Sequence, residues 1–233
     1  MKLAKEEDLK EYLRDDWVER LLLSRTDDLP GSLTCNQWLL DSPPKRYLFS
    51  TLYEDFANGF SGKALDVGGG LTAFTSFFAS RFSYQLLDLM HHDDQQIVRS
   101  LTASVPEGVI HALDWQEFVP SGGYDVVIAN DLFPNVDQRL GEFLEKFLPL
   151  TKEIRLSLTY YNNTRCYKVK RVDGDEIFFM RPWDGYRLSR ELLSFQDRIV
   201  EPDFDFLERD EPSLFPNGRQ VCLVTLKGDL ESL

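Results

Sequence analysis

Hydrophobic residues recur with a helical spacing over the first sixty residues. The spacing is clearest at four positions one helical turn apart: Leu9, Leu13, Trp17 and Leu21. Residues so spaced share one face, which predicts a single helix there. A second helix is predicted from Pro44, which suits a first helical turn, to about Gly59, which suits a helix end. We therefore expect a helical segment over residues 1–60.

From Lys63 onward, short continuous apolar runs alternate with helical stretches. The runs cover residues 63–68, 84–89, 108–113, 124–130 and 153–160. The helical stripes between them lie within residues 71–78, 97–105 and 136–147. Continuous hydrophobicity is typical of strands that are covered on both faces, so the pattern predicts a parallel sheet built of βαβ units.

The pattern changes again after the fifth run. Two apolar stretches flank Asp173-Gly174, a turn pair that predicts a β-hairpin insertion at about 164–183. A helix is predicted over 187–199, and an apolar strand over 218–228 with a partner near 204–210. The expected architecture is an α/β domain over 61–233, preceded by the helices of 1–60, in which an antiparallel C-terminal pair closes the parallel strands.

Three glycines mark the end of the first run. Gly68, Gly69 and Gly70 lie between a strand that ends at Val67 and a helix that begins near Leu71. Glycine permits a tight turn and lets a ligand approach the backbone, and the helix N-terminus offers N–H groups to a negative group. The alternative is an ordinary glycine-rich turn.

Polar residues also stand where three later runs end. They are Asp88 with Leu89, Asp114 with Trp115, and Asn130 with Asp131. A carboxylate at the end of the second strand can accept both hydroxyls of a ribose. Asp114 can bind an adenine amino group while the indole of Trp115 covers the ring. The pattern predicts a nucleotide-like ligand across the carboxyl edge of the sheet.

These motifs resemble those of class I S-adenosylmethionine-dependent methyltransferases over residues 43–227. Asp66-Val67-Gly68-Gly69-Gly70 is similar to the family's D/E-x-G-x-G motif, and Asp88 and Asp114-Trp115 occupy its ribose and adenine positions. The segment 130–133 falls at the family's fourth motif, beside the methyl group and the substrate. The resemblance implies S-adenosyl-L-methionine as cofactor, with Asn130 among its contacts. It also implies a three-layer Rossmann-like sandwich whose seven-stranded sheet has an antiparallel last strand.

The resemblance also gives the N-terminal helices a role. Members of the family often use such helices as a lid over the cofactor. Within the lid, Lys45, Arg46 and Tyr47 are candidate contacts to the methionine carboxylate.

A dinucleotide cofactor is the main alternative. The segment 68–73 also fits the pattern G-x-G-x-x-G/A. Asp66, however, suits a sulfonium and an amino group, whereas a dinucleotide loop does not need it. No tyrosine is followed four residues later by lysine, as short-chain dehydrogenase chemistry requires. An NAD(P)-dependent oxidoreductase is therefore the weaker hypothesis, and a catalytically silent S-adenosylmethionine-binding module stays open.

Candidate catalytic residues lie near the methyl end of the expected cofactor. They are Asp131, Asn130 and Tyr160. Asp131 can take a proton from the acceptor or orient an amine, although capping the following helix is an equally good role. Phe133 and Tyr161 are candidate substrate contacts. In the predicted hairpin, Lys168 and Lys170 favour a small anionic substrate, and a solvated hairpin face is the alternative.

Charge and composition limit the partners. Lys plus Arg number 26 and Asp plus Glu 39, so the net charge is −13, which disfavours nucleic acid as a substrate. No apolar run is long enough for a membrane span, and the charged N-terminus does not resemble a secretory signal. Three scattered cysteines argue against disulfides and against a metal cluster. We expect a cytoplasmic methyltransferase that acts on oxygen or nitrogen of a small molecule.

Overall fold

The computed structural model describes all residues except 26–28, 30–31, 134–136, 171–176 and 232–233. Seven strands form one sheet, in the order β1 (Lys2–Leu3), β9 (Arg219–Lys227), β6 (Thr151–Tyr161), β5 (Tyr124–Phe133), β2 (Lys63–Val67), β3 (Ser83–Leu87) and β4 (Ile110–His111). A separate two-stranded sheet is formed by β7 (Tyr167–Lys170) and β8 (Ile177–Met180). β2, β3 and β4 are parallel, whereas β9 is antiparallel to β6 and β1. This arrangement confirms the mostly parallel seven-stranded sheet with an antiparallel C-terminal strand. The chain divides into two compact units, residues 9–128, and residues 1–8 with 129–233.

The unit of residues 9–128 contains the N-terminal helices and the first parallel strands. Its helices are α2 (Trp17–Ser24), α3 (Thr34–Asp41), α4 (Pro43–Ala57), α5 (Ala73–Ala79) and α6 (Gln95–Ser104). Its strands are β2 (Lys63–Val67), β3 (Ser83–Leu87), β4 (Ile110–His111) and the first half of β5 (Tyr124–Phe133). Aromatic rings of α4 and α5 fill the core, where Phe49 lies 4.2 Å from Tyr53 and 4.5 Å from Phe74, centroid to centroid.

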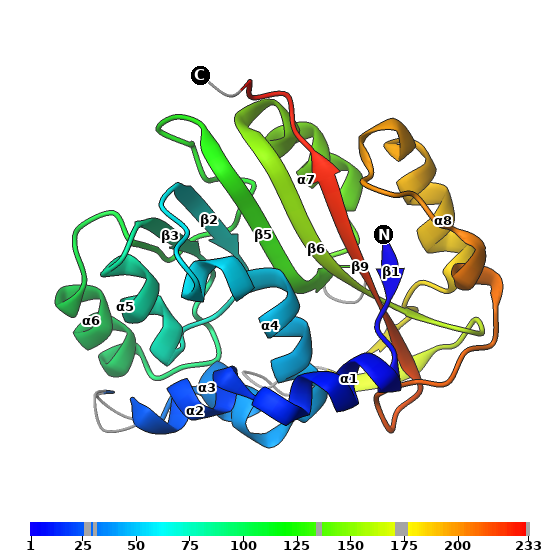
Figure 1. The fold of residues 1–233 in the computed structure, drawn as a ribbon, viewed down its shortest axis with the longest axis horizontal. Helices are drawn as coiled ribbons and strands as arrows, with labels where there is room; N and C mark the ends of the chain where they lie inside the picture. Colours follow the sequence, from blue (N-terminus) through cyan, green and yellow to red (C-terminus); the bar gives the residue numbers. More distant parts are fainter. Residues whose placement is uncertain (26–28, 30–31, 134–136, 171–176, 232–233) are drawn as a thin grey trace. The chain divides into compact units, whose positions relative to one another are not determined.

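The other unit is built on a long antiparallel pair. β6 (Thr151–Tyr161) pairs with β9 (Arg219–Lys227), and β9 lies between β6 and β1 (Lys2–Leu3) (Figure 1). α7 (Leu140–Phe147) and α8 (Gly185–Leu193) belong to this unit, as does the hairpin of β7 (Tyr167–Lys170) and β8 (Ile177–Met180). The predicted hairpin is therefore confirmed, while its Asp173-Gly174 turn lies outside the described residues.

Two predicted elements and one predicted helix cap are wrong. The helix predicted through Leu9 and Leu21 is divided into α1 (Glu6–Tyr12), a 3-10 turn and α2, because the Asp16 side chain accepts the backbone N–H of Glu19 and starts a new helix. The partner expected for β9 near 204–210 is a 3-10 helix, Asp205–Glu208, and β6 and β1 pair with β9 instead. β5 continues through Asn130 to Phe133, so Asp131 lies within a strand and does not cap a helix.

Candidate functional site

The glycine turn after β2 is packed on both sides. Gly68 and Gly70 have φ of 73° and 67°, in the left-handed region that favours glycine. A Cβ on Gly69 would lie 2.4 Å from Oδ1 of Asp66, and a Cβ on Gly70 would lie 2.2 Å from Sγ of Cys35. The side chain of Asp66 therefore leaves no room for a side chain at Gly69, and that of Cys35 leaves none at Gly70.

Asp66 is buried beneath this turn. Tyr53 Oη donates to Asp66 Oδ1 and Tyr84 Oη donates to Oδ2, both at 2.8 Å. Burial raises the pKa of Asp66 to about 7, although the two tyrosine hydrogen bonds oppose the rise. Because each oxygen already has a protein partner, Asp66 supports the loop from below. Its predicted direct contact with a cofactor stays a prediction.

Asp88 follows β3 and holds the loop from the side. Its Oδ2 accepts the backbone N–H of Gly70 at 3.2 Å, and its Oδ1 accepts that of Met90 at 2.7 Å. Burial raises its pKa. The carboxylate has further lone pairs, so it keeps the capacity to accept ribose hydroxyls. The adjacent Leu89 is 47% exposed and offers apolar surface at the same strand end.

Asp114, Trp115 and the first N–H groups of α5, all predicted to face a nucleotide-like ligand, have partners or positions within the protein. Asp114 Oδ1 accepts the backbone N–H of Gln116 at 2.8 Å, while Trp115 is only 5% exposed and belongs to the core. The first N–H groups of α5 are also taken, since Ala73 N donates to Asn36 Oδ1 and Phe74 N to Thr72 Oγ1. This helix end therefore does not offer those two donors to a negative group.

α3 lies against the glycine loop, and this contact could not be predicted from local sequence. Cys35 meets Gly70, and Asn36 caps α5. Thr34 binds the segment after β3, because its N–H donates to Asp93 Oδ1 and its hydroxyl to the carbonyl of His92, both at 2.7 Å. Burial raises the pKa of the Cys35 thiol to about 12, so the thiol stays protonated. The N-terminal helices thus cover the loop that the motif predicts.

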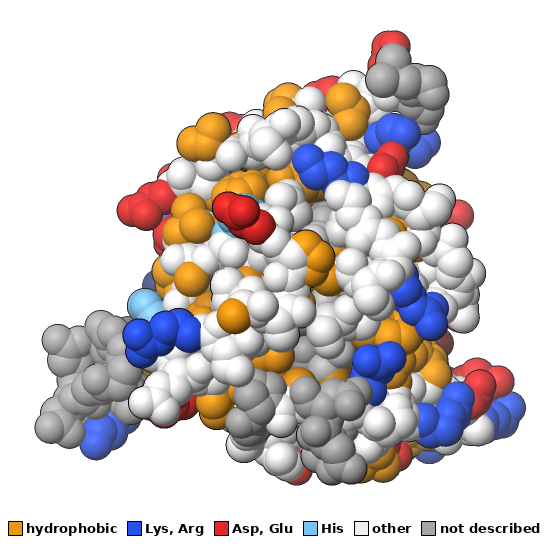
Figure 2. Space-filling view, turned by 90° about the vertical axis from the view of Figure 1, so that its left-hand side faces the viewer, with side chains coloured by type: hydrophobic (Ala, Val, Ile, Leu, Met, Phe, Trp, Pro, Cys, Tyr) orange, Lys and Arg blue, Asp and Glu red, His pale blue; other side chains and the backbone are white. Residues whose placement is uncertain are grey.

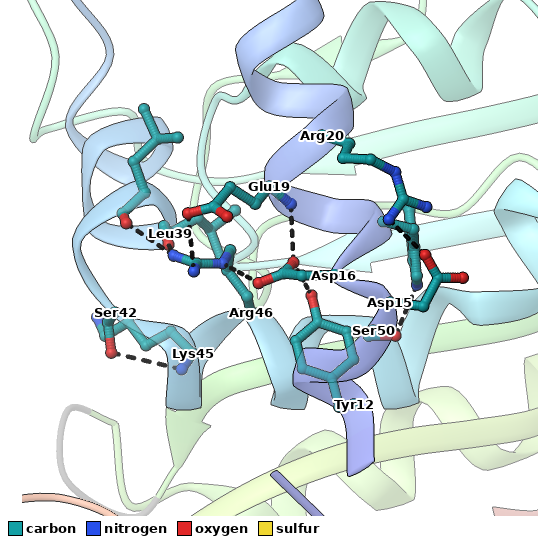
Figure 3. Close-up of polar contacts among 12 residues, drawn as sticks. Tyr12, Asp15, Asp16, Glu19, Arg20, Leu39, Ser42, Lys45, Arg46 and Ser50 are labelled. Carbon is teal, nitrogen blue, oxygen red and sulfur yellow. Dashed lines mark hydrogen bonds and ion pairs between the residues drawn. The ribbon is translucent and has the colours of Figure 1, made fainter. Parts of the chain in front are cut away.

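A buried ion-pair network joins α2, α3 and α4 (Figure 3). The guanidinium of Arg46 is 4% exposed, and its Nε and Nη2 contact Asp16 at 2.7 Å and Glu19 at 2.9 Å. Its Nη1 donates to the carbonyls of Leu39 and Leu40. All three nitrogens of Arg46 thus have partners within the helices, and its predicted contact with a methionine carboxylate stays a prediction. Tyr47, 5% exposed, is likewise a core residue.

In the other unit, polar side chains gather around the end of β5. Ser157 Oγ accepts the backbone N–H of Asp131 at 2.7 Å and donates to Asn130 Oδ1 at 2.6 Å. Asp131 Oδ1 accepts the hydroxyl of Thr159 at 2.7 Å, and Oδ2 accepts Arg219 Nη1 at 3.0 Å. Asp131 has a φ of 59°, a left-handed backbone that is rare for a residue with a side chain. We call these five residues the β5 polar cluster.

Strand alternation sorts the two tyrosines that end β6. Tyr161 is paired with Arg219 and Tyr160 with Gln220 across the antiparallel ladder. Because successive side chains point to opposite faces, Tyr161 shares the face of Arg219 and Thr159, and Tyr160 points to the other face. Tyr160 is fully buried, and burial raises its pKa. Tyr161 therefore replaces Tyr160 as the candidate tyrosine on the face of Asp131 and its partners.

Three other predicted substrate contacts, Phe133, Lys168 and Lys170, lie in two different environments. Phe133 is fully buried, with its ring 5.1 Å from that of Phe143, so it is a core residue. In the hairpin, Tyr167 packs against Tyr161 at 6.4 Å, so Lys168 and Lys170 lie on the opposite face of β7. Both lysines are exposed, and their ladder partners are also exposed, Phe179 to 75% and Ile177 to 55%.

The described residues show no group of three or more His, Cys, Asp or Glu side chains that could hold a metal ion. Within the same residues, no helix is both long and apolar enough to cross a membrane.

On the face drawn in Figure 2, acidic and basic side chains lie scattered among uncharged and hydrophobic ones. The charge of −13 is therefore not gathered into one patch among the described side chains of that face.

No protein-family model and no curated protein matches the chain. Among solved structures, the N-terminal domain of EvdMO1 with SAH bound has a TM-score of 0.50 and 12% identity, over 80% of this chain and 81% of that one. A Burkholderia thailandensis 1,6-didemethyltoxoflavin-N1-methyltransferase, with bound 1,6-didemethyltoxoflavin and S-adenosylhomocysteine, has a TM-score of 0.48 and 15% identity. The match covers 98% of this chain and 92% of that one. Magnesium protoporphyrin IX methyltransferase from Synechocystis PCC 6803, with bound SAM, has a TM-score of 0.47 and 13% identity. The match covers 98% of this chain and 100% of that one. The strand order and the first of these likenesses show that the chain has the Rossmann-like fold of class I methyltransferases.

Proposed function

We propose that this chain binds S-adenosyl-L-methionine and transfers its methyl group to oxygen or nitrogen of a small molecule. The observation that carries the proposal is the loop after β2, which passes without side chains over buried Asp66 and is tied to Asp88 at the end of β3. A loop of bare backbone beside a carboxylate suits the amino acid and ribose parts of this cofactor.

The residues fit the charge of the cofactor as well as its shape. S-adenosylmethionine carries a sulfonium and an ammonium group, and Asp88 and Asp66 supply negative charge next to the loop. Asp88 binds the ribose and exposed Leu89 contacts the adenine. When bound, the cofactor supplies an activated methyl group on a good leaving group. The protein then needs mainly to align the acceptor with it.

The β5 polar cluster supplies the groups that act on the acceptor. Asp131 is held by Thr159 and Arg219, and 33% of its side chain is exposed. It orients an amine or accepts the proton of a hydroxyl as the methyl group is transferred. Asn130 is fixed through Ser157, and Tyr161, which is 5% exposed, lies on the same face as Arg219.

Calorimetry tests the cofactor part of the proposal. The full chain is titrated with S-adenosylmethionine, S-adenosylhomocysteine and NAD(P). We expect both sulfur nucleotides to bind and the dinucleotides not to bind. Asp88→Asn should weaken binding about tenfold or more, since an amide offers hydrogens where Gly70 and Met90 already donate. Asp94→Asn is the matched control, because Asp94 is exposed and caps α6. Binding of NAD(P) alone would establish the oxidoreductase alternative.

Methyl uptake distinguishes an enzyme from a silent binding module. Small-molecule extracts are incubated with the chain and cofactor labelled in its methyl group, and labelled products are identified by mass. We expect a labelled small molecule with the wild type and none with Asp131→Ala. Tight cofactor binding without any labelled product would favour the silent module.

A further inference from the structure

Two arginines converge on the face of β6 that carries Tyr161. Arg219 is the ladder partner of Tyr161, and the guanidinium carbon of Arg165 lies 4.4 Å from the centroid of the Tyr161 ring. Arg165 Nη1 also donates to the carbonyl of Asn217 at 2.8 Å, two residues before Arg219. Burial raises the pKa of Tyr167, and the positive charges of both arginines oppose that rise. Arg165 therefore lies against the ring of Tyr161, and Arg219 is its ladder partner.

The positive charge at this place is only partly balanced. Asp131 pairs with Arg219 at 3.0 Å, whereas Arg165 binds a neutral carbonyl. Within the described residues Arg165 makes no ion pair, in a chain whose overall charge is −13. Among the described residues, Arg219 Nε is a buried donor without a partner. A buried donor without a partner is unfavourable, so the site lacks one acceptor atom.

The arginines are also held in a geometry that suits recognition of an oxyanion. The guanidinium carbon of Arg219 lies 3.9 Å from the centroid of the Phe215 ring, and Arg165 is stacked on Tyr161. Stacking fixes the plane of a guanidinium group and leaves its edge for hydrogen bonds to a carboxylate or phosphate. The side chain of Arg219 is 14% exposed, although its Nε is buried.

We propose that Arg165 and Arg219 bind an anionic oxygen group, a carboxylate or a phosphate, of the small molecule that this chain methylates. The identity of that molecule as a methyl acceptor rests on the proposed function. Lys168 and Lys170 do not take part, because they lie on the face of β7 away from Tyr161.

Nuclear magnetic resonance of the arginine Nε–H groups tests this site in the full chain. The probes are benzoate and phenyl phosphate, with benzyl alcohol as a neutral analogue of similar size. We expect saturable shifts of the Nε–H resonances of Arg165 and Arg219 with at least one of the two anions, and none with benzyl alcohol. A preference between the anions identifies the group as carboxylate or phosphate.

Variants separate a specific site from general attraction to charge. Arg165→Gln, which removes an exposed side chain, should weaken binding of the anion about tenfold, equivalent to about 1.4 kcal/mol. Arg219→Lys keeps the charge near Asp131 but loses the stacked fork, and it should weaken binding similarly. Lys168→Gln removes the same charge as Arg165→Gln and should leave binding unchanged.

The proposal is overturned if neither anion shifts these resonances, or if Lys168→Gln weakens binding as much as Arg165→Gln does. Affinity for S-adenosylmethionine is measured on the same samples. A chain that binds the anions but not the cofactor would refute the proposed methyl transfer while leaving the anion site established. A chain that binds the cofactor but not the anions would refute the anion site while leaving the proposed methyl transfer standing.

Discussion

Replacing Gly70 with alanine tests whether α3 is seated on the glycine loop. The new Cβ would lie 2.2 Å from Sγ and 2.9 Å from Cβ of Cys35, and φ at Gly70 is +67°. The left-handed backbone costs about 1–2 kcal/mol with alanine, and forcing the extra methyl into a packed contact adds about 1–3 kcal/mol. We expect Gly70→Ala to lower the free energy of unfolding by about 2–5 kcal/mol.

Gly108 provides a matched control for the backbone part of this cost. Its φ is +81°, and a Cβ there would meet nothing within 4 Å. Gly108→Ala should therefore cost only the backbone strain, about 1–2 kcal/mol. Both variants are compared with the wild type by urea unfolding, followed by tryptophan fluorescence. The difference between them isolates the contact with α3.

A double-mutant cycle then assigns that difference to Cys35. Cys35→Ala removes the sulfur that a Cβ on Gly70 would overlap most, so the double variant should recover part of the lost stability. If Gly70→Ala and Gly108→Ala cost the same, or if Cys35→Ala recovers nothing, the packing of α3 on the loop is refuted.

Three further changes test other parts of the structure. Asp66 has a pKa of about 7 when folded against an ordinary 3.8, so its contribution to stability is complete below about pH 4 and is lost as the pH rises through 7. Asp66→Asn should remove about 4 kcal/mol of that pH dependence from unfolding curves taken between pH 4 and 8, and unchanged curves would show that the carboxyl is already ionised at pH 4. Arg46→Met should lower the free energy of unfolding by about 3–5 kcal/mol, because it leaves the carboxylate of Asp16 without its cation. Arg20→Met, at an exposed ion pair, should lower it by less than about 1 kcal/mol. Equal losses from the two changes would contradict the buried ion-pair network. Ser157→Ala should lower the rate of methyl transfer while cofactor affinity stays constant, and a rate equal to that of the wild type would remove the serine from the site.

The sequence is most informative where one segment makes a structure by itself. Continuous apolar runs identify β2, β3, β6 and β9, and the Gly68–Gly70 turn is recognisable because strand, turn and helix are neighbours in the chain. β1 has only two residues, too few to show a period, and it exists because β9 offers it an edge. Asp16 divides the first helix because its carboxylate prefers a cap, although the apolar spacing continues past it.

The contacts that complete each site come from distant parts of the chain. Tyr53 reaches Asp66 and Cys35 reaches Gly70 from helices that precede β2, and nothing in their local sequence distinguishes them from core residues. Arg219 is 88 residues from Asp131 and meets it only through the ladder of β6 and β9. Tyr160 and Tyr161 are both predicted as site residues, but their division between two faces depends on a register that is set by pairing with β9.

Ser157 forms hydrogen bonds with both Asn130 and Asp131, and these bonds fix which group donates and which accepts at the end of β5. A hydroxyl has one hydrogen, and Ser157 accepts the N–H of Asp131, so its own hydrogen goes to the carbonyl oxygen of Asn130. The amide of Asn130 cannot flip without losing that bond, and its NH2 group faces away from the serine. An atom placed against that group must therefore offer a lone pair, so the cluster discriminates by hydrogen-bond polarity, independently of size or charge.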